Sequence, residues 1–255
     1  MEINGTLSAI VTGGASGLGE ATARMLSSMG VNVAIFDLDA DKGLNIAKEL
    51  NSDFYEVDVS DVNSVNQAVL AFSKKNEGIQ VAVNCAGIGP AAKTVSRGEA
   101  HSSELFAKVI NINLIGTFNV ASVCAAQMVK NDKYSEDGLR GVIINTASVA
   151  AYDGQIGQAA YSASKGGVVG LTLPMARDLS DKGVRVCSIA PGLFLTPLLE
   201  SLPTEVQESL GGQVPFPSRL GRPKEFAQLV CHIIENDMLN GEVIRLDGAI
   251  RMAPR

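Results

Sequence analysis

The chain has 255 residues, of which 46% are hydrophobic and 19% charged, and its formal net charge is −6. A chain this apolar can bury a large core, which excludes global disorder, and its length suits one large α/β domain or two small ones. The acidic balance, without any run of Lys or Arg, excludes nonspecific nucleic-acid binding because phosphates are repelled. No stretch approaches the roughly 20 apolar residues of a membrane span.

The first residues, MEINGTLSAIVTGG, lack the basic region and long apolar core of a secretory signal. The cysteines and histidines are isolated from one another, which disfavours a disulfide framework and a metal site; they are Cys85, Cys124, Cys187, Cys231, His101 and His232. We therefore expect no metal, and reduced cysteines in a cytoplasmic protein, with the mitochondrial matrix as an open alternative.

Apolar runs of strand length alternate with helical patterns along the chain. In chain order they are strand Thr6–Thr12, helix Gly17–Ser28, strand Asn32–Phe36, helix Ala40–Leu50, strand Asp53–Val57, helix Val62–Lys75, strand Val81–Asn84, helix Glu104–Val129, strand Gly141–Ala147, helix Ala159–Leu179, strand Val184–Ile189, helix Pro223–Glu235 and strand Val243–Leu246. Strands that are apolar on both faces indicate a buried parallel sheet. We predict one α/β domain over residues 1–255, a Rossmann-type doubly wound sheet of about seven strands with helices on both faces.

Two long segments interrupt this alternation, a polar one at 89–103 and a Pro-rich, partly apolar one at 193–222. Long loops in compact domains are usually functional. Both follow strand ends, where ligands bind in open α/β sheets, so we expect the first to be a substrate insert and the second a lid.

The first strand runs into the glycine-rich turn TGGASGLG, residues 12–19. Such a turn lets the backbone approach a pyrophosphate, and the following helix supplies N–H donors and a positive dipole end. Three spaced glycines alone would equally fit a structural turn, but the strand–turn–helix context favours dinucleotide binding. The expected contacts come from Gly13, Ser16, Gly17, Leu18 and Gly19.

Acidic residues follow the second and third strands. Asp37, 18 residues after Gly19, can accept hydrogen bonds from ribose hydroxyls and would repel a 2′-phosphate, which favours NAD over NADP. Asp58 and Val59 are placed to meet the adenine, although an aspartate there could also cap the next helix.

The residues that indicate chemistry are Ser148, Tyr161 and Lys165. Tyr161 and Lys165 are four apart on a predicted helix and so share one face. An ammonium beside a phenol favours the phenolate and lowers its pKa, which suits acid–base work on an alcohol or carbonyl oxygen. Ser148, just past a strand end, can hydrogen-bond the same oxygen. A silent NAD-binding scaffold has no need of this set.

The chain resembles the short-chain dehydrogenase/reductase family over essentially its whole length. The matching residues are TGGASGLG (12–19), Asp37, Asp58, Asn84-Cys85-Ala86-Gly87, Asn113, Ser148, Tyr161-Ser162-Ala163-Ser164-Lys165 and Pro191-Gly192. The resemblance implies that Cys85, Phe194 and Thr196 contact NAD, as do Tyr161 and Lys165, the latter at the nicotinamide ribose. It also implies that Asn113 supports a water relay behind Lys165; a structural helix-kink role for Asn113 stays open. Cys85 replaces an Asn of many members, a change we expect to be harmless.

Within that family the chain is similar to the branch of type 2 3-hydroxyacyl-CoA dehydrogenases, also classed among 17β-hydroxysteroid dehydrogenases. The supporting stretches are 145–167, 190–199, 213–221 and 240–252. The resemblance implies interconversion of 3-hydroxyacyl-CoA and 3-oxoacyl-CoA. A steroid or other secondary-alcohol dehydrogenase is the alternative, and a non-catalytic scaffold a distant one.

An acyl-CoA substrate would need further binding residues. Gln158, three residues before Tyr161, is placed to meet the polar end of the substrate, and the apolar lid can close over an acyl chain. CoA phosphates need local cations in an acidic protein, and the candidates are Lys93, Arg97, Arg219 and Arg222, each of which could equally be an ordinary solvated charge.

The helices Glu104–Val129 and Ala159–Leu179 carry apolar residues on more than one face. One face covers the sheet and the other needs a different cover, which predicts a homo-oligomer. The family resemblance implies a homotetramer with contacts from the tail Asp247–Arg255.

Overall fold

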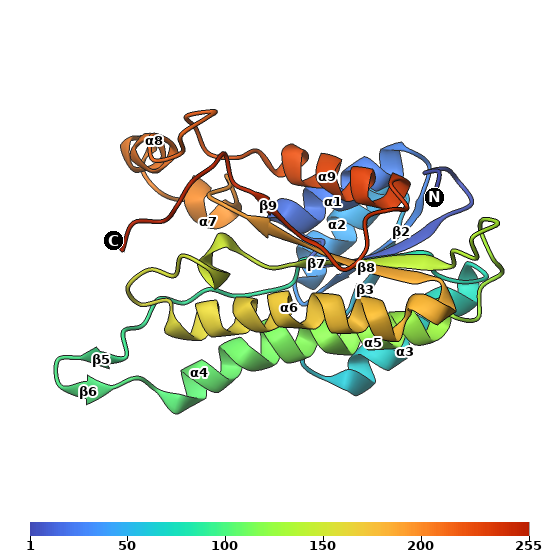
Figure 1. Ribbon diagram of the computed structural model, residues 1–255, viewed down its shortest axis with the longest axis horizontal. Helices are drawn as coiled ribbons and strands as arrows, with labels where there is room; N and C mark the ends of the chain where they lie inside the picture. The colour runs from blue at the N-terminus through green and yellow to red at the C-terminus, as the bar shows by residue number, and fades with distance from the viewer. Residues whose placement is uncertain (255) are drawn as a thin grey trace.

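The computed structural model describes residues 1–254, the side chain of Leu198 excepted, so Arg255 of the predicted tail lies outside the described residues. Its centre is a seven-stranded sheet in the order β3-β2-β1-β4-β7-β8-β9, and every pairing in it is parallel (Figure 1). The strands are β1 (Ser8–Thr12), β2 (Asn32–Asp37), β3 (Asp53–Glu56), β4 (Val81–Asn84), β7 (Gly141–Thr146), β8 (Val184–Pro191) and β9 (Val243–Leu246). This confirms the predicted doubly wound α/β fold.

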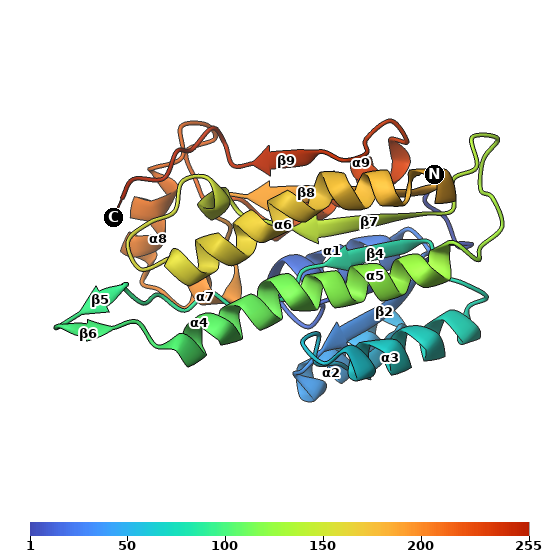
Figure 2. The ribbon, with the colours of Figure 1, turned by 60° about the horizontal axis from the view of Figure 1, so that its bottom comes forward.

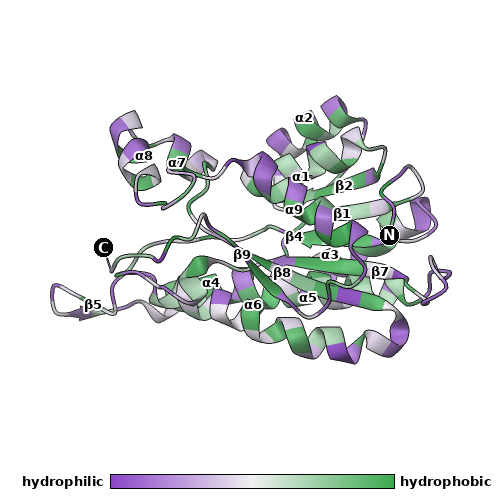
Figure 3. Cartoon of the chain, turned by 45° about the horizontal axis from the view of Figure 1, so that its top comes forward, coloured by the Kyte–Doolittle hydropathy of each residue, from purple (hydrophilic) through white to green (hydrophobic). Residues whose placement is uncertain are grey.

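Helices cover both faces of the sheet (Figures 1 and 2). One layer holds α1 (Gly17–Ser28), α2 (Ala40–Leu50) and α9 (Pro223–Glu235); the other holds α3 (Val62–Lys75), α4 (Ser103–Ile110), α5 (Gly116–Met128) and α6 (Ala159–Asp178). Successive side chains of a strand point to opposite faces. In β1, therefore, Ala9 and Val11 join one buried cluster and Ile10 joins the other. The mostly hydrophobic strands lie between helices of mixed hydropathy (Figure 3).

The helix predicted over Glu104–Val129 is not uniform. A π-helical turn, η1 (Asn111–Ile115), separates α4 from α5. By length and composition alone, Ser103–Met128 could cross a membrane, which the sequence analysis did not anticipate. In the structure α5 packs against α3 and β4, and Val120, Ala121 and Cys124 are fully buried. It is therefore placed as a core helix of this fold.

The carboxyl ends of the strands point towards one edge of the molecule (Figure 2). The strand order reverses direction between β1 and β4, and ligands bind in open α/β sheets at such a switch point. The two long segments lie at this edge with the C-terminus. Segment 193–222 contains α7 (Pro197–Glu200) and α8 (Thr204–Gly211).

Segment 89–103, the predicted substrate insert, contains a two-stranded hairpin. Its strands are β5 (Val95–Ser96) and β6 (Glu99–Ala100), which project beyond the sheet (Figure 2). The turn residues Arg97 and Gly98 both have positive φ, at 52° and 83°, as a two-residue hairpin turn requires. The hairpin carries Arg97 at its tip.

Candidate active site

The structure brings Ser148, Tyr161 and Lys165 together. Ser148 follows the end of β7, and the other two lie in the first turns of α6. Ser148 acts on the Tyr161 phenol to lower its pKa, and Lys165 Nζ lies 5.8 Å from the centre of the Tyr161 ring. Ser148 and Lys165 are buried. The arrangement presents two hydroxyl groups to one substrate oxygen, with a positive charge behind them.

Burial controls the charges in this cluster. Desolvation lowers the pKa of Lys165 to about 8, and its ammonium donates to the Thr146 carbonyl at 2.7 Å. Burial also raises the pKa of Tyr161, while the Ser148 hydrogen bond acts in the opposite direction. The expectation that the pKa of Tyr161 is lowered towards working pH is therefore wrong for the chain by itself, because burial dominates. At neutral pH Tyr161 is a phenol and can donate a proton.

Asn113, in the π-helical turn, is fully buried and clamps the loop after β4. Its Nδ2 donates to the Ile88 carbonyl at 2.8 Å and to Ser164 Oγ at 3.0 Å, while its Oδ1 accepts from Ile88 N at 2.8 Å. A Cβ built on Gly87 would lie 3.6 Å from Lys165 Nζ. Asn113 thus holds the chain that passes over Lys165, and its role in a water relay stays a prediction.

The glycine-rich turn has the close packing that a dinucleotide cradle needs. Gly13 has φ +61°, and a Cβ there would lie 2.8 Å from Ala86 N; a Cβ on Gly19 would lie 2.2 Å from the Gly13 carbonyl oxygen. Ser16 is the N-cap of α1, followed by Gly17 and Leu18, but its side chain makes no capping hydrogen bond. The N–H groups of this helix end are therefore open to an anion such as a pyrophosphate.

Asp37 lies at the end of β2 beside this turn. Its Oδ2 accepts from Ala15 N at 3.0 Å and its Oδ1 from Asp39 N at 3.1 Å. These bonds fix the carboxylate and leave lone pairs for ribose hydroxyls. Exposed Leu38 adds no cation. Lys42, the cation on the next helix, is ion-paired with Asp39 at 2.9 Å.

Asp58 and Val59 follow β3. Asp58 Oδ1 accepts from Ser60 N and Ser60 Oγ at 2.9 and 2.6 Å, so one of its oxygens serves the local turn. The cap of α3 is Asp61 instead. Val59 is buried, and its carbonyl accepts from Asn119 Nδ2 at 3.0 Å. Adenine contact at this pair stays a prediction.

Cys85 is joined to the cofactor turn through its backbone. Thr12 Oγ1 accepts from Cys85 N and Ala86 N, both at 3.1 Å. The thiol accepts from Thr146 Oγ1 at 3.6 Å, and burial raises its pKa to about 11. It is therefore a neutral thiol that links β4 to β7. All four cysteines are free, and residues 1–254 contain no cluster of His, Cys, Asp or Glu able to hold a metal ion.

The start of the lid reaches the glycine-rich turn. A Cβ on Gly17 would lie 3.3 Å from Pro197 Cδ and 3.7 Å from Thr196 Cγ2. The lid ends are joined by two backbone bonds of 2.8 Å, from Leu195 N to the Gly221 carbonyl and from Gly221 N to the Leu193 carbonyl. Phe194 is buried against Gly221. The lid is thus anchored beside the predicted cofactor site.

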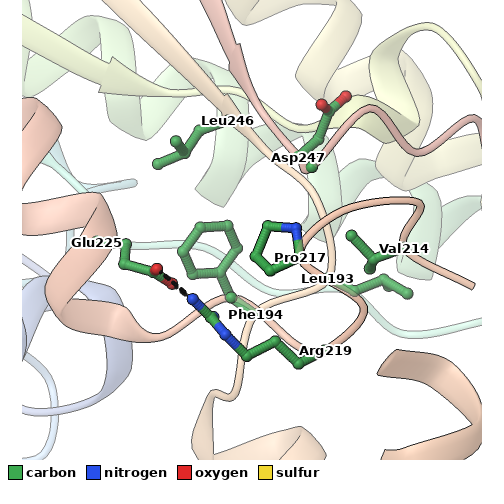
Figure 4. A pocket seen from close by; sticks show the side chains of 10 residues that line it. Leu193, Phe194, Val214, Pro217, Arg219, Glu225, Leu246 and Asp247 are labelled. Atoms are coloured by element: carbon green, nitrogen blue, oxygen red, sulfur yellow. Dashed lines mark hydrogen bonds and ion pairs between the residues drawn. The ribbon is translucent and has the colours of Figure 1, made fainter. Parts of the chain in front are cut away.

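Two cavities flank these loops. The larger, of about 500 Å³, lies between the 89–103 segment and the start of α6, and Lys93 and Gln158 are among its lining residues. The smaller, of about 120 Å³, lies behind Phe194 at the base of the lid (Figure 4). There Arg219 makes two bonds of 2.9 and 2.6 Å to the Glu225 carboxylate. Arg219 is therefore not the free cation that the sequence analysis considered for CoA phosphates.

Replacing Lys165 by Met should alter how stability depends on pH. A buried lysine with a pKa near 8 binds fewer protons between pH 8 and 10.5 than it does in the unfolded chain. Its burial cost is therefore present in full at pH 7 and is relieved as pH rises through this window. From pH 7 to 10.5, the free energy of unfolding of wild type should gain on the order of 2 kcal/mol relative to Lys165→Met.

Urea unfolding of both proteins at the two pH values measures this difference. Lys130→Met, at an exposed lysine, is the matched control and should show no such change. A difference in the free energy of unfolding between wild type and Lys165→Met that does not change with pH would contradict the buried-ammonium account.

Residues 8–207 match the family model described as short chain dehydrogenase. The chain is 56% identical over 252 residues to the 3-hydroxyacyl-CoA dehydrogenase type-2 of Bos taurus, covering 97% of this chain and 96% of that one. It is 54% identical to the protein of the same name from Drosophila melanogaster, with 96% and 97% covered.

A solved structure shows the same fold. The crystal structure of 3-hydroxyacyl-CoA dehydrogenase type-2 from Mycobacterium avium superposes with a TM-score of 0.94 at 43% identity, and the match covers 100% of both chains. Fold and sequence therefore match these proteins over nearly the full length of the chain. The chain belongs to the short-chain dehydrogenase family and is an oxidoreductase that uses a nicotinamide cofactor.

Proposed function

We propose that the protein interconverts a 3-hydroxyacyl-CoA and a 3-oxoacyl-CoA with NAD. The observation that carries the reaction is the grouping of Ser148 and Tyr161 beside buried Lys165. The names of relatives that match this chain over nearly their whole length support the substrate. In this proposal residues 1–255 act as one domain, with 89–103 as substrate insert and 193–222 as lid.

The residues divide the acid–base work. In reduction, Ser148 and Tyr161 donate hydrogen bonds to the substrate carbonyl oxygen, and Tyr161 passes its proton to that oxygen as negative charge develops. In oxidation, the tyrosine oxygen accepts the hydroxyl proton. Lys165, charged below pH 8, stabilises the phenolate left by proton transfer. A bound nicotinamide supplies or accepts the hydride.

Replacing Tyr161 by Phe removes the proton donor and little else. Positioned acid–base groups contribute about 10²–10⁴-fold, so kcat should fall by at least about 100-fold. Steady-state kinetics with Tyr55→Phe as control measures this, because Tyr55 is a phenol on β3 away from the site. A near-normal kcat in Tyr161→Phe would remove Tyr161 from the mechanism.

Asp37 supports the choice of NAD. Its carboxylate is fixed by two backbone N–H groups at the end of β2, and a fixed negative charge there repels a 2′-phosphate. Val59, Cys85, Phe194 and Thr196 complete the proposed cofactor contacts.

Asp37→Ala should weaken NAD binding and raise the ratio of NADP to NAD activity. Losing a hydrogen-bonded charge costs about 1.5–3 kcal/mol, so KM for NAD should rise by roughly tenfold or more. The kinetic comparison of both cofactors uses Asp41→Ala, an exposed carboxylate on α2, as control. A wild-type protein that prefers NADP would contradict the assignment of Asp37 as the residue that selects NAD.

The larger cavity is the proposed substrate site. It is bordered by Gln158, close to Tyr161, and by Lys93 of the insert, with Arg97 exposed at the hairpin tip. Gln158 is proposed to meet the polar part of the acyl group. Lys93 and Arg97 supply positive charge for CoA phosphates, while exposed Arg222 remains a further candidate.

The double variant Lys93→Gln, Arg97→Gln should raise KM for acetoacetyl-CoA, and more at low salt than at high salt. KM for a small ketone without CoA should hardly change. The exposed pair Lys48→Gln, Lys130→Gln controls for net charge. Equal effects on both substrates would favour the steroid or simple-alcohol alternative.

We also propose a homotetramer. Phe106, Ile115 and Phe118 on the α4–α5 helix and Leu173 on α6 are each at least 40% exposed, so this helical layer carries apolar surface without cover in one subunit. Light scattering of the purified protein should give four times the subunit mass, and a monomer would contradict the proposal. Four free cysteines fit the reducing environment of the cytoplasm or mitochondrial matrix.

A further inference from the structure

The loop between β7 and α6 carries functional groups at both ends, Ser148 at its start and Gln158 at its close. Its residues Gly154–Gln158 form one wall of the larger cavity. The loop packs tightly against the catalytic helix, since a Cβ on Gly154 would lie 2.4 Å from Ser162 Oγ. A displacement of this loop would therefore move Gln158 relative to Tyr161.

Arg245, on the edge strand β9, holds this loop from behind. Its Nη2 contacts Asp153 Oδ2 at 2.8 Å, and its Nε contacts Asp247 Oδ2 at 2.7 Å. The same Nη2 donates to the Ile250 carbonyl at 3.0 Å, and the guanidinium carbon lies 5.2 Å from the centre of the Tyr152 ring. Arg245 therefore joins the loop, β9 and the start of the C-terminal segment.

The C-terminal segment continues this contact to the cavity wall. Gln155 Nε2 donates to the Ala253 carbonyl at 2.9 Å, and Ile156 N donates to the Pro254 carbonyl at 3.0 Å. Gln155 N in turn donates to Gln158 Oε1 at 3.0 Å. The chain end lies beside this loop in both ribbon views (Figures 1 and 2). Hydrogen bonds, together with the backbone between Ile250 and Ala253, thus connect Arg245 to Gln158.

We propose that Arg245 is a positioning residue for the substrate. By clamping the loop and the segment 250–254 together, it fixes the wall that carries Gln155 and Gln158 and so sets the affinity for the substrate. This inference rests on the proposed function, which determines the choice of acetoacetyl-CoA as the assay substrate.

The charges explain why the clamp depends on this side chain. Asp153 and Asp247 both bind the one guanidinium, and the side chains of Arg245 and Asp153 are each only 22% exposed. Without Arg245 these two carboxylates would face each other in a partly buried setting and repel. The loop would then separate from β9 and carry Gln158 with it.

Arg245→Met tests the proposal, because Met keeps an unbranched apolar stem and removes the charge. We expect KM for acetoacetyl-CoA to rise about tenfold, because a substrate misplaced by a change remote from the chemistry can lose this much. We expect kcat and KM for NADH to change less than about twofold. Arg24→Met is the matched control, since Arg24 also binds two carboxylates, Glu20 and Glu49 at 2.8 Å each, but lies on α1. It should behave as wild type.

A chain ending at Met252 is the second variant. It removes the Ala253 and Pro254 carbonyls and leaves the ion pairs of Arg245 intact. It should therefore also raise KM for acetoacetyl-CoA. If Arg245→Met fails to fold, this variant tests whether the clamped segment sets the substrate affinity. Unchanged KM in the variants that fold, or an equal loss in kcat and both KM values, would overturn the proposal. If wild type reduces no CoA ester, the proposed function fails, and the same variants with a ketone that wild type accepts test the clamp separately.

Discussion

A buried ammonium group is the constraint on which the candidate site depends. Lys165 Nζ sits at 4% residue exposure with the Thr146 carbonyl as acceptor, and taking a charge out of water is costly. The surrounding elements keep that charge in place. β7 supplies the carbonyl, and the chain at Gly87 passes close to the ammonium. Asn113 binds Ile88 through two hydrogen bonds and Ser164 through a third. The π-helical turn puts Asn113 where this clamp is possible.

The same burial separates the roles of the two titrating groups. It lowers the pKa of Lys165 and raises that of Tyr161, so at neutral pH the site holds a cation beneath a neutral phenol. A phenol is the proton donor that ketone reduction needs, and the cation favours the phenolate that this step leaves. A buried charge of this kind lowers the stability of the fold but serves the reaction, as is common at active sites.

Much of the fold was predictable because its signals are local. Strand and helix periods predicted α2 and α3 at their observed bounds, and the Tyr161–Lys165 spacing identified the catalytic helix. Tertiary effects were not predictable in this way. The pKa direction of Tyr161 follows from burial, the hydrogen bonds between Asn113 and Ile88 from the packing of distant segments, and the pairing of Arg219 with Glu225 from lid packing. The β5–β6 hairpin did have a local signal, since Arg97-Gly98 is a turn pair between short strands.

The most direct test of the central claim is turnover by the wild-type protein. Oxidation of NADH is followed with acetoacetyl-CoA, with a steroid ketone and with a simple ketone, and each reaction is repeated with NADPH. The site geometry and the relatives together predict the highest kcat/KM with acetoacetyl-CoA and NADH. A higher kcat/KM with the steroid or the simple ketone, or no turnover with any of the three, would contradict the account.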